Sequence, residues 1–209
     1  MYVSSVKKAT DISRPPNVVR RANATQRPGE NRDKLLEVGA KLFVKRGIAT
    51  VSVEQLVEKA GVSRATFYGF FANKYELAAA ILLPVFDTGI TALARLDSLP
   101  PRKAAEEIIS VYLHLWKEHR DALLLTGSFD GAIFTYIKLP HDAFNAELKK
   151  VLQVIESGGL LRNNSASLTL EVLAKTAIPL LRIYKNRAEL EDFFRESILG
   201  LIIKDELIA

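Results

Sequence analysis

The sequence predicts an all-α protein, with a small N-terminal unit of three helices and a larger helical domain behind it. Apolar residues recur at helical spacing over most of the chain, and no segment shows the clear alternation of a half-buried strand. Residues 51–77 contain two short helix patterns that are separated by a glycine-containing turn. Because such a unit uses only part of the 209 residues, enough chain remains for a second core.

Residues 51–77 carry separate start and stop signals for short helices. Ser52 and Gln55 have the spacing of a capping box, and Gly61 can take the positive φ of a sharp helix end. Ser63 can cap the next helix, and Asn73 can cap the helix after that. Helix, glycine-containing turn and helix is the layout whose second helix enters the DNA major groove. The segment therefore predicts DNA binding.

The helix expected over residues 31–46 supports this interpretation. Two capped helices joined at a glycine also occur in small helical proteins of other kinds, so the turn alone leaves both readings open. Residues 31–46 place most of their apolar side chains on one stripe, and Gly47 follows them. Three helices of these lengths form one unit with its own core, which predicts a helix-turn-helix domain over residues 31–76.

In the stretches LLEVGAKLFVKRG and TVSVEQLVEKAGVSRATFYGFFANKYEL, the chain resembles the TetR family of bacterial transcriptional regulators. The resemblance implies a homodimer that binds a partly palindromic DNA operator and releases it when a small molecule occupies the C-terminal domain. It also implies, by position, groove-facing Ser63, Arg64, Ala65, Thr66 and Gly69, and phosphate-binding Tyr68 and Lys74. Ser52 and Phe70 complete the set of expected DNA contacts. The sequence departs from the usual family pattern at Val57, Gly69 and Phe70.

Arg64 is the long polar side chain at the start of the second short helix. Val62 and Phe67 are expected to pack inward, which leaves the residues between them facing out. A guanidinium can bond a guanine edge in two places, so Arg64 is the expected base-reading residue.

Residues 1–30 form a basic segment of their own. Six Lys and Arg side chains stand there against Asp11 and Glu30, among three prolines and many small polar residues. This composition predicts a mostly disordered N-terminal arm. The arm is either a solvated tail that aids solubility or a DNA-binding arm along the minor groove, and its position beside the helix-turn-helix favours the second.

Residues 77–209 are expected to form a helical regulatory and dimerisation domain. The expected helices cover residues 75–96, 103–118, 143–156, 167–184 and 188–207, with a junction at 119–121. Pro84 is expected to bend the first of them. The apolar stretch 122–139 is expected to be irregular or broken at its glycines, with Pro140 ending it and Asp142 capping the next helix.

The last two expected helices are too apolar to be buried on one side only. A stripe of that width needs a partner on two sides, its own domain and another surface. The resemblance implies that this second surface is the same helix pair of another subunit, in a four-helix bundle, whereas the alternative is a helix buried in one large core. The candidate dimer residues are Leu173, Ala177, Leu180, Leu181, Phe194, Ile198, Leu201 and Ile202.

Aromatic and aliphatic side chains of the regulatory domain are candidates for the wall of an apolar cavity. They are Phe86, Ile90, Tyr112, Trp116, Phe129, Phe134 and Tyr136. Tyr hydroxyls and the indole N–H would orient a ligand there, although the same set can also be plain core. The resemblance favours a pocket. Because charges are sparse on these faces, we expect a largely apolar or aromatic effector.

Composition narrows the remaining classes of protein. Hydrophobic content of 48%, charged content of 25% and a formal net charge of +5 are ordinary for a globular chain, and the absence of cysteine suits a reducing cytosol. Uncharged apolar stretches such as residues 77–86 are too short to span a bilayer, and the first thirty residues lack a signal-peptide core. A cytoplasmic location is therefore expected.

The motifs favour a DNA-binding protein, and the family resemblance implies a ligand-responsive, dimeric repressor. The alternative is a dimeric DNA-binding protein with no small-molecule effector. An enzyme on a helical bundle is disfavoured, because no catalytic constellation, phosphate-binding glycine loop or cofactor motif occurs. The three histidines are too scattered for a metal site, so neither metal nor cofactor is expected.

Overall fold

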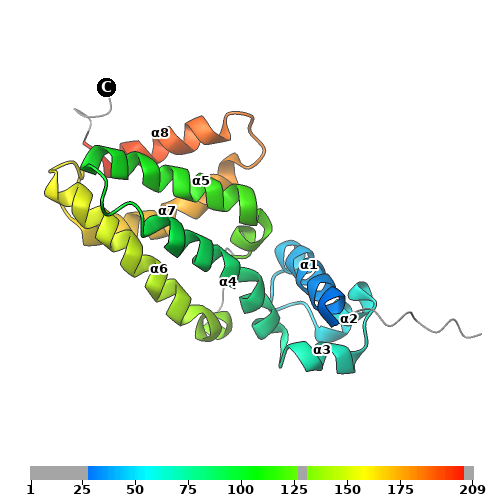
Figure 1. The fold of residues 1–209 in the computed structure, drawn as a ribbon. Coiled ribbons are helices and arrows are strands. Elements are labelled where there is room, and N and C mark those ends of the chain that lie inside the picture. The colour runs from blue at the N-terminus through cyan, green and yellow to red at the C-terminus, as the bar shows by residue number, and fades with distance from the viewer. Residues whose placement is uncertain (1–27, 127–130, 205–209) are drawn as a thin grey trace, which may run out of the picture.

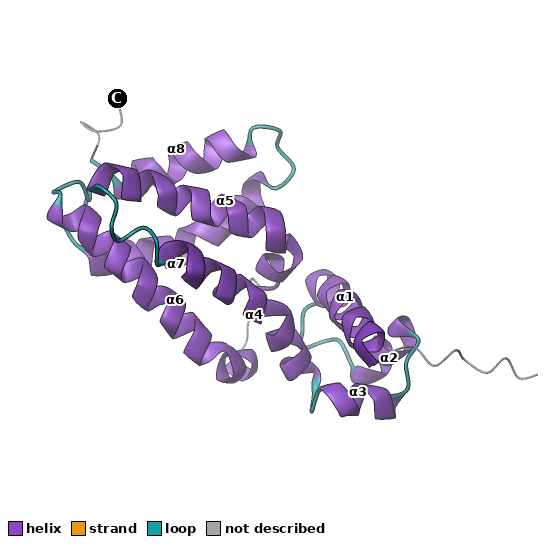
Figure 2. Cartoon of the chain, in the orientation of Figure 1, coloured by secondary structure: helices purple, strands orange, loops and turns teal. Residues whose placement is uncertain are grey.

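The protein is all-α, as predicted. The computed structural model describes residues 28–126 and 131–204, which form helices and loops (Figures 1 and 2). The helices are α1 (Pro28–Arg46), α2 (Val53–Ala60), α3 (Arg64–Phe70), α4 (Lys74–Leu93), α5 (Pro101–Leu125), α6 (Gly131–Ser157), α7 (Ala166–Tyr184) and α8 (Leu190–Ile202). Figure 1 shows α1–α3 at one end of the molecule and α5–α8 at the other, with α4 running between them. The residues of the predicted arm before residue 28 lie outside the described part.

Helices α1–α3 form a small unit around a shared apolar core. Leu35 and Phe43 of α1, Leu56 of α2 and Phe67 of α3 are fully buried in it. The predicted caps are confirmed. The capping box of Ser52 is complete, Gly61 has a left-handed φ of 67°, and the side chains of Ser63 and Asn73 cap α3 and α4. Local sequence signals therefore set the ends of α2 and the starts of α3 and α4.

Helix α4 belongs to both ends of the molecule. Its first turn follows α3, and its later turns pack against α1, α5 and α6. By length and composition α4 could cross a membrane, which the sequence analysis did not expect of any segment. In the fold it is the central helix, and its apolar side chains such as Leu77, Leu82 and Phe86 are buried in the protein.

Helix α5 joins two segments that the sequence analysis separated. Pro101 stands at its start, and the backbone leaves helical geometry at His119, where φ is −130° and ψ is 32°. The predicted junction at residues 119–121 is thus a kink inside one helix. The helix resumes and buries Leu123 and Leu125 before it ends.

Helix α6 continues through Pro140, so the predictions that Pro140 ends a helix and that Asp142 starts another are wrong. An interior proline removes one backbone hydrogen bond and costs about 3 kcal/mol. The helix has buried residues on both sides of the proline, which include Ile133 and Ile137 before it and Leu148 after it. Burying each such side chain stabilises the helix by roughly 1.5–3 kcal/mol, so this burial outweighs the proline.

The residues after α8 pair through backbone hydrogen bonds with the loop between α6 and α7. Helix α8 ends at Ile202, earlier than predicted, and Ile203 pairs with Leu161 in an isolated antiparallel bridge. Arg162 N donates to Ile202 O at 2.8 Å, and Lys204 N donates to Leu160 O at 3.1 Å. Residues 205–207 of the predicted helix lie outside the described part. The pairing draws the chain out of helical conformation after α8.

Candidate functional site

The N-terminal end of α3 is held rigid by its cap. Ser63 Oγ accepts a hydrogen bond from Thr66 N at 3.0 Å and shares a second one with Thr66 Oγ1 at 2.8 Å. Phe67 anchors the opposite side of α3 in the core, where its ring meets those of Tyr68 and Phe71. The outward face of α3 therefore presents Arg64 and Ala65, which are exposed.

Arg64 is paired with an acidic residue of α2. Its Nη1 lies 2.9 Å from Glu54 Oε1, and both side chains are largely exposed. Hydrogen bonds from the Glu54 backbone N–H and the Ser52 hydroxyl, and then the charge of Arg64, lower the pKa of Glu54. The carboxylate is thus ionised and holds the guanidinium over the outer surface of the helix pair. Sequence reasoning missed Glu54, which is ten positions away from Arg64.

Lys74 is more constrained than a simple phosphate contact. Its Nζ donates to Ala49 O at 2.6 Å and to Val51 O at 2.9 Å, and it lies 5.4 Å from the Tyr75 ring centroid. An ammonium has three N–H donors, so one remains for another partner. Lys74 therefore ties the first turn of α4 to the loop before α2, a role that the sequence analysis did not include.

The other expected DNA contacts differ in accessibility. Tyr68 is 50% exposed, and Gly69 is exposed with open space where a side chain would project. Ser52 is half-buried in its capping box. Phe70 is half-buried and packs against the core.

A cavity of about 300 Å³ lies among α4, α5, α6 and α7, at the lower end of the usual size of ligand pockets. Its wall is mostly apolar, with a few polar groups. The lining residues are Leu82, Val85, Phe86, Tyr112, Leu115, Leu123, Thr126, His141, Phe144, Asn145, Leu148, Leu173, Ala174, Ile178, Pro179 and Arg182. Of the predicted ligand residues, Phe86 and Tyr112 belong to this wall.

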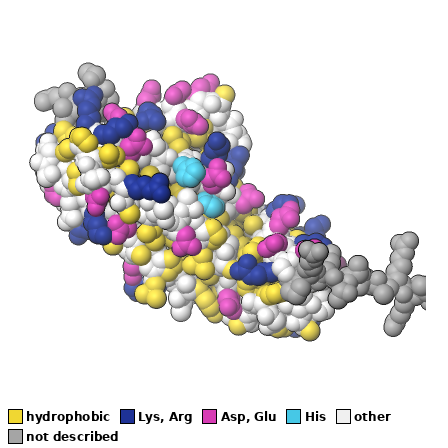
Figure 3. Space-filling view, viewed as in Figure 1, with side chains coloured by type: hydrophobic (Ala, Val, Ile, Leu, Met, Phe, Trp, Pro, Cys, Tyr) yellow, Lys and Arg dark blue, Asp and Glu magenta, His cyan; other side chains and the backbone are white. Residues whose placement is uncertain are grey.

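The other predicted ligand residues have different surroundings. Ile90 and Trp116 pack outside the cavity wall, and Arg120 lies 5.5 Å over the Trp116 ring. Phe134 is partly exposed, and the Tyr136 hydroxyl accepts a hydrogen bond from Asn73 Nδ2 at 2.8 Å. Figure 3 shows hydrophobic side chains on this face, where α6 lies beside α4. Phe129 lies outside the described residues.

Gly89 lets α4 and α6 approach beside the cavity. A Cβ at this position would lie 2.5 Å from Phe144 Cε2, which is closer than real Cβ contacts come. The Phe144 ring stands edge-on to Phe86 and Tyr112 and lines the cavity. The absence of a side chain at residue 89 therefore gives the Phe144 ring its place in the wall.

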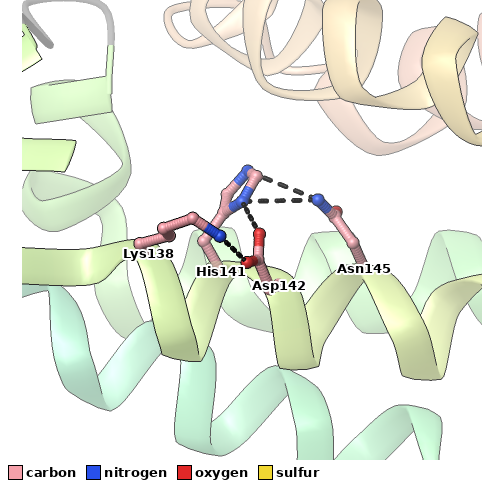
Figure 4. Close-up of polar contacts among 4 residues, drawn as sticks. All are labelled: Lys138, His141, Asp142 and Asn145. Carbon is pink, nitrogen blue, oxygen red and sulfur yellow. Dashed lines mark hydrogen bonds and ion pairs between the residues drawn. The ribbon is translucent and has the colours of Figure 1, made fainter. Parts of the chain in front are cut away.

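The polar part of the α6 wall centres on His141 (Figure 4). Asp142 Oδ2 pairs with Lys138 Nζ at 2.5 Å, and Asp142 Oδ1 lies 3.5 Å from His141 Nδ1. The hydrogen bond from Lys138, and then that from His141, lower the pKa of Asp142. Asn145 Nδ2 lies 3.4 Å from His141 Nδ1. The cluster combines an exposed ion pair with two polar side chains, His141 and Asn145, that reach the cavity.

Most of the predicted dimer residues face the protein's own core. Six are fully buried in the single chain: Leu173, Ala177, Leu181, Phe194, Ile198 and Ile202. They cannot meet a partner in this conformation, whereas Leu180 is half-buried and Leu201 is exposed. The inward side of each wide apolar stripe is set by packing with α5, which contacts both α7 and α8, and helical spacing does not reveal it.

The exposed face of α7 carries a different apolar set. Leu168 is 53% exposed and Ile183 is 71% exposed, and Pro179 lies on the surface between them. Val172 and Thr176 continue the same helical spacing and are half-buried.

Among the described residues, no group of three or more His, Asp or Glu side chains could hold a metal ion.

The sequence and the fold are both similar to those of known regulators. The family model "Bacterial regulatory proteins, tetR family" matches residues 35–81. TtgR of Pseudomonas putida, an HTH-type transcriptional regulator, is 37% identical over 59 residues, which are 28% of this chain and 28% of TtgR. The chain thus matches little more than a quarter of the length of that relative.

Two solved structures share the fold over most of the chain. PfmR, a TetR family transcriptional regulator from Thermus thermophilus, matches with a TM-score of 0.67 at 20% identity, covering 81% of this chain and 95% of PfmR. SmeT, the repressor of the Stenotrophomonas maltophilia multidrug efflux pump SmeDEF, matches in its triclosan complex with a TM-score of 0.63 at 19% identity. That match covers 86% of this chain and 94% of SmeT.

Proposed function

We propose that this chain, whose residues 35–81 match the tetR family model, is a cytoplasmic, homodimeric repressor of a partly palindromic operator. We propose further that it leaves the operator when a small, largely apolar ligand fills the cavity. The observation that carries the proposal is the outward face of α3. Arg64, Ala65, Tyr68 and Gly69 are exposed there, on a helix whose other side is anchored by the buried Phe67. That face lies at the end of the molecule away from α7 and α8 (Figure 1).

The exposed stripe on α7 supports a dimer. Leu168, Pro179 and Ile183 lie on the surface at helical spacing, which is the pattern of a helix that packs on a second partner. A two-fold axis beside α7 and α8 would pair this stripe with its copy, because a two-fold interface uses the same patch twice. Such a dimer would present two α3 helices to successive major grooves, about 34–36 Å apart.

Helix α4 is the route by which a ligand would act on DNA binding. Its N-terminal turn is tied to the α1–α2 loop through Lys74, and its later turns line the cavity with Leu82, Val85 and Phe86. A ligand that prefers a different tilt of α4 would change the separation of the two α3 helices. A tenfold loss of operator affinity requires about 1.4 kcal/mol of such preference.

The test is binding of the full-length protein to the promoter DNA upstream of its own gene. We expect a saturable complex that survives competition by unrelated DNA, and its loss when a ligand that raises the melting temperature is added. A protein that binds promoter and unrelated DNA equally would contradict operator recognition. If no compound in a thermal-shift library altered the complex, the protein would be a DNA-binding dimer without an effector.

Deleting residues 1–27 is expected to weaken DNA binding without unfolding the protein. The deletion removes six cationic side chains next to the DNA unit and none of the described core. Each lost phosphate contact lowers the slope of log affinity against log salt by about 0.9, so the salt dependence becomes shallower. Fluorescence anisotropy at several salt concentrations measures both effects. Full affinity of the shortened protein at low salt would identify the segment as a passive tail.

Replacing Tyr136 with Phe is expected to weaken ligand-induced release while leaving operator affinity within about twofold. The change removes the hydroxyl that binds Asn73, the cap residue between α3 and α4, from a helix that lines the cavity. A hydrogen bond contributes about 0.5–1.5 kcal/mol, so the ligand effect should fall by up to roughly tenfold. Anisotropy titrations with and without ligand measure it.

Tyr184→Phe is the matched control, because its hydroxyl bonds Ser197 between α7 and α8 at 3.0 Å, away from α4. If Tyr136→Phe and Tyr184→Phe released operator like the wild type, the α6–α4 hydrogen bond would have no part in the response.

A further inference from the structure

We propose that the cavity is built for a small amphipathic acid, an apolar body that carries one carboxylate, with the carboxylate bound by Arg182. This inference rests on the proposed function, because it specifies the ligand of the same cavity. It adds one acid group to the largely apolar effector that the sequence predicts. The cavity wall carries a positive charge at Arg182, and Arg182 has no partner within the described residues. The buried polar groups of the wall are neutral donors, and the wall runs along α7 from a buried apolar end to an exposed end at Arg182.

The described part of the cavity wall has no negative charge to oppose an acid. None of its sixteen residues is Asp or Glu, eleven are apolar, and Arg182 carries a permanent positive charge. Asp142, which follows the wall residue His141, is outside the wall and pairs with Lys138 at 2.5 Å. An anion would therefore enter an apolar space whose fixed charge is positive, whereas an amine would meet repulsion.

Arg182 is available for such a partner. Within the described part of the chain it makes no ion pair and no hydrogen bond. Two neighbouring cations are already engaged, since Arg187 pairs with Glu189 at 3.7 Å and Arg120 donates to Lys185 O at 3.0 Å. A guanidinium presents a planar fork that fits a carboxylate with two parallel hydrogen bonds. The free fork at the cavity wall is thus suited to an acid group.

The buried polar groups in the wall add donors without adding negative charge. Tyr112 is nearly fully buried, and burial raises the pKa of its phenol, so the hydroxyl stays neutral. No hydrogen bond to this hydroxyl occurs within the described residues. Asn145 is half-buried, and among the described residues its Nδ2 makes only long contacts to the His141 ring, at 3.4 and 3.5 Å. Both groups can donate to an oxygen of a ligand.

The wall changes character along α7. Leu173, which is buried, and Arg182, which is exposed, both line the cavity. They are nine positions apart on the helix, or about 13–14 Å at 1.5 Å per residue. A ligand with its apolar body against Leu173 and its carboxylate at Arg182 would keep the charged group at the solvent-exposed end of the cavity. That arrangement matches the amphipathic character of the wall.

The test is isothermal titration calorimetry of the full-length protein with octanoate, octanol and octylamine, which share one apolar body. At neutral pH we expect octanoate to bind at least about tenfold more tightly than octanol, which corresponds to about 1.4 kcal/mol, and octylamine to bind most weakly. Arg182→Gln should lose that tenfold for octanoate and leave octanol within about twofold. Lys175→Gln, on the exposed side of α7 and paired with Glu171 at 3.8 Å, is the matched control and should change neither.

Ala174→Trp places a large ring in the wall and is expected to remove binding of octanoate and octanol alike, which fixes the site in this cavity. Equal affinity of the wild type for octanoate and octanol would overturn the proposal, as would full octanoate binding by Arg182→Gln or Ala174→Trp. Failure of all three compounds to bind would also overturn it. Because calorimetry needs no DNA, the proposed function is judged separately: octanoate that binds without releasing operator would leave the acid site intact and contradict ligand-controlled release.

Discussion

Ile183→Asp is expected to convert a dimer into a monomer and to lower operator affinity by about 10²–10⁴-fold. Ile183 is 71% exposed at the C-terminal end of the α7 stripe, so its loss leaves the core of the chain intact. A two-fold interface would contain the residue twice, and each buried Ile stabilises the contact by roughly 1.5–3 kcal/mol. Two unpaired aspartates would replace them. A monomer engages one half-site and forfeits the avidity of the second.

Light scattering at micromolar concentration and anisotropy with operator DNA measure the two effects. Leu139→Asp is the matched control, because Leu139 is 82% exposed on α6 and not on α7. It receives the same charge and should remain a dimer with full operator affinity. A dimeric Ile183→Asp protein would place the interface elsewhere, and a monomeric wild type would contradict the dimer itself.

Arg64→Ala is expected to reduce operator affinity by about 1–3 kcal/mol per half-site and to relax specificity at the contacted base pair. Arg64 is the exposed guanidinium at the start of α3, and the Ser63 cap below it is rigid. In the free protein Arg64 pairs with Glu54 at 2.9 Å, so this ion pair must break before the guanidinium can bind DNA. Glu54→Gln should therefore raise affinity for all DNA and reduce discrimination between operator and unrelated sequences.

Lys74→Ala provides the contrast. It should weaken all DNA sequences alike if the remaining N–H of Lys74 meets a phosphate, and it should also lower the melting temperature because two carbonyl contacts are lost. Anisotropy titrations with operator variants and with unrelated DNA separate these effects. If Arg64→Ala and Lys74→Ala changed sequence preference equally, the division into base-reading and phosphate-binding roles would be wrong.

The sequence determined the helix-turn-helix because its signals are local. A capping box needs Ser52 and Gln55 in register, and a sharp helix end needs a residue such as Gly61 that accepts a positive φ. Neither depends on what packs above the helix. Residues 35–81, which contain these signals, are also the part of the chain that matches the family model.

Local signals were misleading where packing is strong. Pro140 is a helix breaker on its own, yet α6 passes through it because residues before and after it are buried and the helix packs against α4. The position of a proline is local information, but the energy that outweighs it comes from contacts with residues much earlier in the chain.

The tertiary structure alone decided which side chains meet. The hydrogen bond between Asn73 and Tyr136 joins residues 63 positions apart, and no spacing in the sequence marks it. The apolar stripes on α7 and α8 were predictable from helical spacing. The side that faces the core was not, because spacing shows which residues share a face but not which element packs against it. Leu173 and Phe194 were therefore predicted at a partner surface and lie in the chain's own core. Arg182 lines the cavity because α7 lies beside α6 there, and that placement rests on long-range burial that helical periodicity does not encode.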